Sequence, residues 1–394
     1  MLGAYRQVLR VPGAVAFASA GLIARFPLSM QTLGTVLLVA DATGSYALAG
    51  AVSATLAAAQ ALLGPVLGRL VDRHGQARVL LPALAVHTAG AAVLIACAAA
   101  DLPVWTLFPA AALWGGSFAQ AGSLVRARWA HALGGSPLLP TAFSLESVLD
   151  EVVFVVGPVL VTTLATQVSP IVGVVAAWAF AATGSLALAA LRRTEPPAHP
   201  VTGRGPSALR LAGLRVMVVV GLATGGIFGS VEVATVAFTD ERGSPGAAGI
   251  VLALLAAGSL LSGLGYGTVS WRTPAARRFV LGVGVLALVT VPLLAAGSVP
   301  VLAGLVFLAG FAISPALIAG FGLLEELVPA ASRTEGLTWF GTGLGLGVAV
   351  AASIAGQVVD ASGARAAFGV TVAAGVLAAL TALAGARTFS RAGR

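Results

Sequence analysis

Apolar stretches long enough to cross a lipid bilayer recur along the whole chain, and short segments that hold most of the charged residues separate them. A helix that crosses the hydrocarbon core needs about 20 mostly apolar residues. Twelve segments meet this need, at 12–40, 46–70, 79–100, 103–125, 141–166, 168–191, 211–238, 246–270, 279–298, 300–324, 336–359 and 365–386. The pattern therefore predicts an all-α membrane protein with twelve transmembrane helices.

One long polar, proline-rich segment, LRRTEPPAHPVTGRGPSALRL, lies between the sixth and the seventh predicted span. Such a composition is typical of a loop. We expect an N-terminal six-helix half over residues 1–192, a cytoplasmic linker over 193–210 and a C-terminal six-helix half over 211–394. Arg6 and Arg10 precede the first apolar run as in a signal peptide. Because no small-residue cleavage site follows and the run is long enough to span, we assign it to the first helix.

The composition agrees with a membrane protein. With 58% hydrophobic and 9% charged residues, the chain has too little polar surface to cover a water-soluble body. Of its 22 basic residues, all arginine, nineteen fall in loops on one side, Arg242 and Arg365 on the other, and Arg25 inside a span. Positive loops are retained in the cytoplasm, so we expect a multi-pass protein of the cytoplasmic membrane with both termini cytoplasmic. The net charge of +8 reflects this topology, and we expect no nucleic-acid partner.

Residues that commonly hold metals or nucleotides are sparse. Cys97 is the only cysteine, and the four histidines are scattered without an i, i+4 pair, so we expect neither a disulfide nor a metal site. The stretch GTGLGLG, Gly341 to Gly347, lies inside the eleventh predicted span and indicates close helix packing rather than a phosphate loop. Since the chain has no lysine, it has no Walker lysine. We expect no cofactor, and an ion or solute gradient as the source of energy.

Charge gathers in the loop after the second predicted span, in GRLVDRHGQAR, Gly68 to Arg78. A weaker copy, GTVSWRTPAAR, runs from Gly267 to Arg277 at an offset of 199 residues, close to half of the 394-residue chain. A repeat at this distance, in the corresponding loop of each half, is what a duplicated six-helix transporter would leave.

The helix count, the central loop and the pattern G-x-x-x-D-R-x-G-x-x-R resemble the major facilitator superfamily. The gating-loop residues that carry the motif are Gly68, Asp72, Arg73, Gly75 and Arg78. The second copy departs from the motif, with Trp271 at the aspartate position and Pro274 at the second glycine position. The resemblance implies alternating access, in which two halves move about a central small-molecule site near the bilayer midplane.

The resemblance also implies how the loop works. Asp72 would meet the N-terminal end of the eleventh helix in the outward-open state, where the helix dipole favours a negative charge by about 0.3–1 kcal/mol. Arg126, Arg128 and Glu146 would complete a cytoplasmic charge network that breaks when the halves move apart. The alternative is that these side chains are ordinary anchors of the cytoplasmic side.

Gly157 and Pro158 in the fifth predicted span resemble the core of a motif of family antiporters, G-x-x-x-G-P-x-x-G-G. Val153 and the pair Val161-Thr162 replace the flanking glycines, so the match supports export only in part. Proline in a transmembrane helix frees a carbonyl that protein or water must satisfy.

Four charged residues lie several positions inside predicted spans, where an unpaired charge costs at least ~2.5–3.5 kcal/mol. They are Arg25, Asp150, Glu151 and Glu232. Because such side chains must face partners or water, we assign them to a central cavity and to proton coupling. The uncharged polar residues Gln31, Gln60, His87 and Gln120 either form interhelical hydrogen bonds or contact substrate.

Asp150 and Glu151 are adjacent on a helix and point about 100° apart, so they cannot share one partner equally. Arg25 lies at a similar depth, and we expect it to pair with one of them. The other would be desolvated beside a like charge, which favours proton binding. Glu232 is the alternative proton carrier. A static ion pair that only fixes helix packing is the remaining interpretation.

These features favour a monomeric secondary active transporter that exports a small organic or drug-like solute by proton-coupled antiport. The alternative is a proton-coupled uptake symporter for a small organic anion, with Arg25 as the anion contact. A remote alternative is a receptor without transport on the same scaffold. No soluble domain, nucleophile–base pair or metal-binding cluster in the sequence indicates an enzyme.

Overall fold

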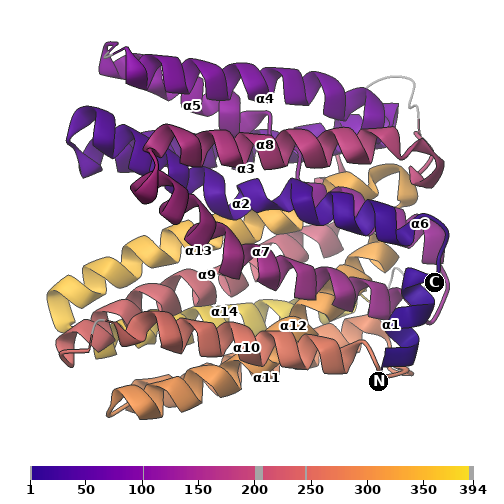
Figure 1. The fold of residues 1–394 in the computed structure, drawn as a ribbon. Coiled ribbons are helices and arrows are strands. Elements are labelled where there is room, and N and C mark those ends of the chain that lie inside the picture. Colours follow the sequence, from indigo (N-terminus) through magenta and orange to yellow (C-terminus); the bar gives the residue numbers. More distant parts are fainter. Residues whose placement is uncertain (1, 101, 200–206, 245, 390–394) are drawn as a thin grey trace. The chain divides into compact units, whose positions relative to one another are not determined.

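The structure is a computed structural model that describes residues 2–100, 102–199, 207–244 and 246–389. Within these residues the chain forms α-helices and short 3-10 helices and no strand (Figure 1). The α-helices are α1 (Leu2–Leu9), α2 (Ala14–Thr43), α3 (Tyr46–His74), α4 (Gln76–Ala99), α5 (Leu107–Gly116), α6 (Ala121–Leu133), α7 (Leu139–Gln167), α8 (Pro170–Ala190), α9 (Ala212–Glu241), α10 (Ala247–Tyr266), α11 (Ala275–Thr290), α12 (Val299–Leu327), α13 (Arg333–Ser362) and α14 (Ala364–Phe389). The 3-10 helices are η1 (Val104–Thr106), η2 (Arg192–Thr194), η3 (Ala208–Arg210), η4 (Val291–Ala295) and η5 (Ala330–Ser332).

Eleven of the described helical segments are long and apolar enough to cross a membrane. They contain α2, α3, α4 and each helix from α7 to α14, and each coincides with a predicted span. The predicted all-α membrane architecture is therefore confirmed.

The remaining predicted span, 103–125, consists of two helices. After η1 and α5 the backbone leaves the helical conformation at 117–120, and α6 follows. The Ser117 hydroxyl donates to the Leu113 carbonyl oxygen over 2.6 Å and satisfies a carbonyl at the end of α5. The prediction of one continuous span missed the glycine and polar residues that stand at the break, Gly115, Gly116, Ser117 and Gln120.

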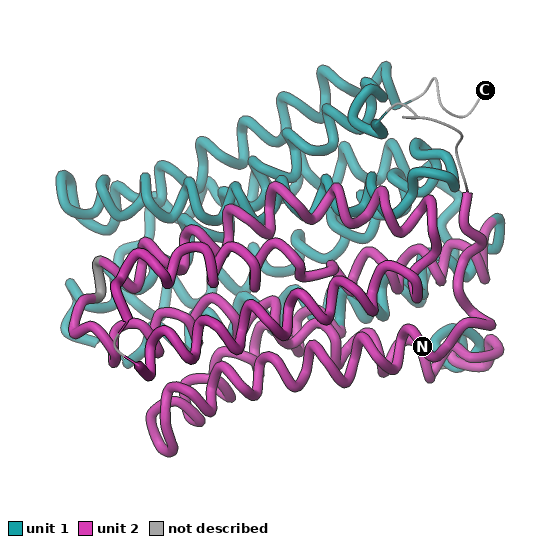
Figure 2. Tube along the Cα trace, turned by 90° about the horizontal axis from the view of Figure 1, so that it is seen from above, with its two compact units in different colours: residues 1–8, 135–148, 206–394 teal, residues 9–134, 149–205 magenta. Residues whose placement is uncertain are grey.

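The chain consists of two compact units (Figure 2). Unit 1 holds residues 1–8, 135–148 and 206–394, and unit 2 holds residues 9–134 and 149–205. The two sets of helices expected from the sequence, with a boundary at 193–210, stay a prediction; residues 200–206 of that linker lie outside the described residues.

Each unit has its own apolar core. In unit 2, buried side chains of α2, α3, α4, α5, α7 and α8 gather around the fully buried Trp114. In unit 1, residues of α9, α10, α12, α13 and α14 pack together, and the Phe238 and Phe368 rings meet edge to face with centroids 6.1 Å apart. Close van der Waals packing within each unit holds its helices together.

Helices α9 and α13 of unit 1 pack with almost no space between their backbones. A Cβ at Gly347 would overlap the Leu222 carbonyl oxygen, and one at Gly225 would overlap the Leu344 carbonyl oxygen. Small residues allow such an approach. The predicted close helix packing of the GTGLGLG stretch is therefore confirmed, and we call this contact the α9–α13 seam.

Three hydroxyl groups of unit 1 bind carbonyls at the end of α10. The donors and acceptors are Tyr5 to Leu264 (3.0 Å), Thr141 to Gly267 (2.7 Å) and Ser144 to Gly263. The last carbonyls of a helix lack intrahelical partners, so these hydroxyls form a cap, here named the hydroxyl cap of α10. Burial raises the pKa of the Tyr5 hydroxyl above its usual value, which keeps it protonated as a donor.

Candidate functional site

The centre of the candidate site is the carboxylate of Asp150 on α7, which binds two arginines of unit 2. Arg25 Nη1 on α2 lies 3.2 Å from Asp150 Oδ1, and Arg126 Nη2 on α6 lies 2.6 Å from Asp150 Oδ2. Arg25 and Asp150 each lie eleven residues after the first residue of their helices, which is about 16 Å along the axis. We call these three residues the arginine–aspartate site.

The two arginines are buried, with exposures of 2% and 3%, whereas the Asp150 side chain is 28% exposed. Asp150 thus presents one carboxylate oxygen to each of the two buried guanidinium groups. Sequence reasoning assigned Arg126 to the cytoplasmic charge network. The structure brings it to Asp150, together with Arg25.

The start of α6 lies beside the same guanidinium groups. The Arg126 Nη1 donates to the Gly122 carbonyl oxygen over 3.4 Å, and a Cβ at Gly122 would lie 3.5 Å from Arg25 Nε. No side chain caps the N-terminus of α6. Half-helix N-termini within a membrane favour negative charge, so the break in the fourth span and the two arginines together can attract an anionic group.

Two further carboxylates, Glu151 and Glu232, lie inside predicted spans. Glu151 follows Asp150 on α7 and is half-buried, and Glu232 is exposed on α9 of unit 1. An ionised carboxylate that faces lipid inside a membrane span raises the free energy by at least ~2.5–3.5 kcal/mol. Glu151 and Glu232 therefore each need a partner or water while they are ionised.

The gating loop of unit 2 joins α3 to α4. Gly75 has a φ of 90° between the two helices, a conformation that favours glycine. Asp72 is 8% exposed, and its backbone carbonyl accepts a hydrogen bond from the His199 amide over 2.9 Å. Gly68 is buried and Arg78 is exposed. The expected contact of Asp72 with the eleventh helix joins two units and stays a prediction.

Arg128 is fully buried and connects several elements at one end of unit 2. Its guanidinium donates to the Gln76 side chain (2.7 Å), the Thr194 hydroxyl (2.7 Å) and the carbonyls of Leu188 (2.7 Å) and Leu191 (2.8 Å). These partners lie on α4, at the end of α8 and in η2. Sequence reasoning placed Arg128 in a network with Glu146, which is fully buried on the part of α7 that belongs to unit 1.

Glu195 is a residue that sequence reasoning missed. Its Oε1 accepts a hydrogen bond from the Ala77 amide at the start of α4 over 3.2 Å, and a Cβ at Gly75 would lie 2.7 Å from the same oxygen. A carboxylate at a helix N-terminus is stabilising. The beginning of the predicted linker thus packs against the gating loop. The sequence does contain a signal for this residue, because Glu195 is the only acidic residue in the otherwise basic segment 191–211.

Gly157 marks a close approach of α7 to α2 within unit 2. A Cβ there would overlap Ser29 Oγ, and that hydroxyl donates to the Val153 carbonyl oxygen over 2.9 Å. Pro158 lies inside the continuous helix α7. The missing side chain of Gly157 therefore lets a hydroxyl of α2 reach the backbone of α7.

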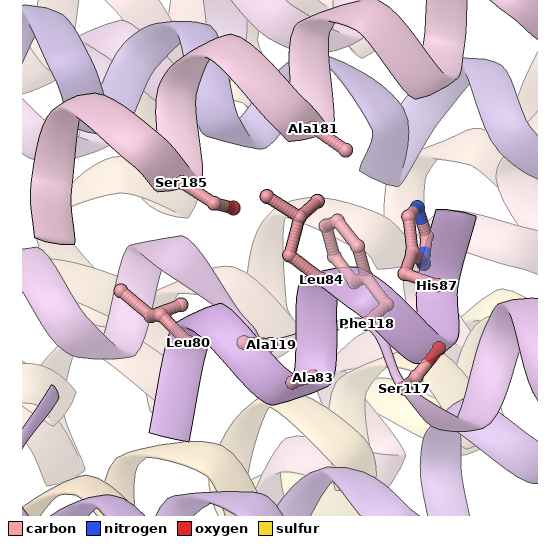
Figure 3. A pocket seen from close by; sticks show the side chains of 9 residues that line it. All are labelled: Leu80, Ala83, Leu84, His87, Ser117, Phe118, Ala119, Ala181 and Ser185. Atoms are coloured by element: carbon pink, nitrogen blue, oxygen red, sulfur yellow. The ribbon is translucent and has the colours of Figure 1, made fainter. Parts of the chain in front are cut away.

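His87 forms interhelical contacts through both ring nitrogens. Its Nδ1 lies 2.9 Å from the Trp114 carbonyl oxygen and its Nε2 accepts from Trp114 Nε1 over 3.0 Å. This arrangement requires a proton on Nδ1 alone, so the ring is neutral. His87 also lines a small pocket with Ser117, Phe118 and Ser185 (Figure 3), but it has no free nitrogen to offer a ligand there.

Gln31 is 1% exposed, and neither its amide oxygen nor its amide nitrogen has a hydrogen-bond partner among the described residues. Ala24 and Gly34 both pack against α8, and Gln31 follows Ala24 by about two turns and faces the same helix. Buried amides are nearly always satisfied. We therefore expect a bound water or a substrate group at this position.

The arrangement offers no metal site. Among the described residues, no group of three or more histidine, cysteine, aspartate or glutamate side chains lies close enough to hold an ion. The chemistry available within the arginine–aspartate site is proton exchange on a carboxylate and recognition of charge by guanidinium groups.

A protein-family model described as the Major Facilitator Superfamily matches residues 17–297 and, in a second overlapping match, 218–392. No curated protein sequence matches the chain significantly.

Several solved structures share the fold. A bacterial homologue of the iron transporter ferroportin in an outward-facing state is 15% identical with a TM-score of 0.73, over 96% of this chain and 99% of that one. The E. coli fucose:proton symporter FucP is 14% identical with a TM-score of 0.71, over 95% and 98%. The human organic anion transporter TETRAN is 20% identical with a TM-score of 0.63, over 96% and 98%. At these identities the likeness shows the fold alone.

Proposed function

Because the chain belongs to the major facilitator superfamily, we propose that it is a secondary active transporter that works by alternating access and couples a small organic or drug-like solute to protons. The observation that carries this proposal is the partly exposed carboxylate of Asp150, held by two buried arginines at membrane depth. Intramembrane charges of this kind mark ion and substrate pathways. The solved structures of similar fold are of transporters, not enzymes.

The arginine–aspartate site suggests how proton and solute movement are coupled. A proton on Asp150 removes the negative charge that Arg25 and Arg126 contact and so weakens both contacts. Conversely, the two guanidinium groups favour the ionised form of Asp150 and oppose proton binding. Proton binding and the arginine contacts therefore oppose one another, as coupling requires. Glu151 and Glu232 remain the alternative proton carriers.

Export is the proposed direction. Its support is the antiporter-like Gly157-Pro158 pair, which allows the approach of Ser29 on α2 to the backbone of α7. The spans consist largely of alanine, valine, leucine and glycine. A cavity lined by such side chains suits weakly polar cargo.

Proton-coupled uptake of a small organic anion is the second candidate. It is favoured by the uncapped start of α6 beside Arg25 and Arg126, because a helix N-terminus and two guanidinium groups attract a carboxylate or a phosphate. In this mechanism the anion takes over the arginines, and Asp150 binds the proton that travels with it.

Proteoliposomes test these proposals. A thermal-shift screen selects a solute that binds, and counterflow of the labelled solute then shows whether the protein transports it. Imposing a pH gradient of either sign decides the direction: an antiporter moves solute against the proton flow, and a symporter moves it with the proton flow. A receptor that does not transport would show binding without exchange, which would contradict the proposal.

We also propose the cytoplasmic membrane as the location, with both termini in the cytoplasm and a monomeric state. The support is the distribution of arginines between the loops. Fusion of a reporter that is active only in the cytoplasm to the C-terminus tests the orientation, and an inactive fusion would contradict it.

A further inference from the structure

The loop between α10 and α11, in the weak second copy of the gating loop, holds an ordered cluster of aromatic rings and an arginine. The Tyr266 and Trp271 rings stack with centroids 4.4 Å apart, and Trp271 Nε1 donates to the Tyr266 carbonyl oxygen over 3.1 Å. Arg278 Nη1 donates to the Tyr266 hydroxyl over 2.5 Å, and its guanidinium carbon lies 5.5 Å from the Trp271 ring centroid. Stacking and cation–π contacts thus fix the loop.

The exposed side chains of this loop and of the start of α11 are cationic and aromatic. Trp271 is 39% exposed, and Arg272 and Arg277 are both exposed. No acidic residue lies between 267 and 278. Glu326 acts electrostatically on Arg278, so the charge available to a ligand belongs mainly to Arg272 and Arg277.

The helices that flank the loop carry large apolar side chains on their exposed surfaces near the same end. On α10, Leu261 and Leu264 are 51% and 39% exposed, and on α11, Leu281 is 57% exposed. Exposed leucines on membrane-spanning helices contact acyl chains. Tryptophan prefers the level of the lipid headgroups, and arginine near the end of a span reaches the headgroup phosphates.

We propose that residues 267–278, which form the α10–α11 loop and the first turn of α11, bind the headgroup of an anionic phospholipid, with Arg272 and Arg277 on its phosphate and Trp271 at the headgroup–acyl boundary. The site is built where the first copy of the motif has Asp72, a buried carboxylate. A carboxylate at that position would repel a phosphate, whereas Trp271 provides a fixed amphipathic surface. This inference does not depend on the solute or on the direction of transport.

Native mass spectrometry of the full-length protein, with phosphatidylglycerol and phosphatidylcholine as probes, tests the site. We expect preferential retention of phosphatidylglycerol, and a loss of roughly fivefold in affinity for each arginine removed in Arg272→Gln and Arg277→Gln. Trp271→Ala should weaken binding as well, and Trp271→Phe, which keeps a ring for stacking, should retain most of it.

The matched control is the pair Arg192→Gln and Arg193→Gln, two exposed arginines in η2 of unit 2. We expect the control pair to keep lipid binding. Equal losses in both pairs would overturn the proposal, because any cytoplasmic arginines would then serve. Thermal stabilisation by millimolar inorganic phosphate equal to that by phosphatidylglycerol would also overturn it, since the site would then recognise a free anion. Circular dichroism of each variant confirms that the helices remain folded.

Discussion

The α9–α13 seam of unit 1 and the arginine–aspartate site of unit 2 hold transmembrane helices together by different means. In the seam, glycines such as Gly225 and Gly347 bring two backbones into contact. In the site, Arg25, Arg126 and Asp150 connect α2, α6 and α7 through charge. A contact between backbones has no protonation state, whereas a carboxylate between arginines does. The difference agrees with the proposal that proton exchange occurs in unit 2, and it makes the seam a fixed element of unit 1.

The largest effect should come from breaking the seam. Gly347→Leu forces a side chain against the Leu222 carbonyl oxygen, so α9 and α13 must separate, at a cost of more than about 3 kcal/mol. We expect little folded protein and a large fall in its unfolding temperature. Gly345→Leu is the control, because a Cβ at Gly345 has no atom within 4 Å. Similar unfolding temperatures for the two variants would show that the seam is not a fixed element.

Removing the charge of the arginine–aspartate site should affect transport most. Asp150→Asn leaves Arg25 and Arg126 without their carboxylate, and a variant that cannot exchange a proton cannot use the gradient. We expect proton-driven accumulation to fall at least about tenfold, since one charge-assisted contact contributes about 1.5–3 kcal/mol, while counterflow exchange persists.

Glu151→Gln and Glu232→Gln are the comparisons for this variant. If Asp150 carries the proton, both retain gradient-driven transport. If Glu232→Gln alone loses it, the proton carrier lies in unit 1, and the proposed division of roles between the units is wrong. A fluorescence assay of proton uptake into proteoliposomes separates these outcomes.

The sequence predicted the membrane spans well, because the apolar periodicity depends only on lipid as the solvent of each helix. It did not predict the division of the fourth span at 117–120, where α5 ends with a close approach of Gly115 to Leu56 and a hydrogen bond of the Ser117 hydroxyl, both of which are features of the folded structure. It also did not predict α1, whose eight residues are too short to give a hydropathy signal.

The ion-pair partners of the intramembrane charges were harder to predict from the sequence than the depths of these residues along their helices. The depths of Arg25 and Asp150 followed from counting along their helices, and an ion pair of Arg25 with Asp150 is present. That Arg126 shares the carboxylate depends on where α6 restarts, which is a tertiary feature. The roles of these residues in transport, like the contact of Asp72 with the eleventh helix, stay predictions.

Two arginines of α6 have different contacts. Arg126 binds the Asp150 carboxylate, whereas Arg128 connects α6 to α4, the end of α8 and η2. Arg128→Lys cannot reproduce the four hydrogen bonds of a planar guanidinium, so we expect a loss of about 2–3 kcal/mol in the free energy of unfolding. Arg126→Lys keeps a charge near Asp150 and should lower transport more than stability. Thermal unfolding and proton-driven uptake measured on both variants check this. If Arg126→Lys and Arg128→Lys both lowered the unfolding temperature and the rate of uptake to similar relative extents, the two arginines would not have separate roles.

The smallest effect should come from the hydroxyl cap of α10. Tyr5→Phe removes one of three hydroxyl donors, so we expect a loss of about 1 kcal/mol and a fall of about 1–2 °C in the unfolding temperature. Burial raises the pKa of Tyr5 in the folded protein above its usual value of 10.0. A raised pKa contributes stability that is fully present below the pKa of the unfolded chain and is lost as the pH rises through the folded value. The difference between wild type and Tyr5→Phe should therefore stay constant from about pH 6 to 9 and narrow above about pH 10, as unfolding followed by tryptophan fluorescence can measure. A difference that changes between pH 6 and 8 would show that another group governs the cap.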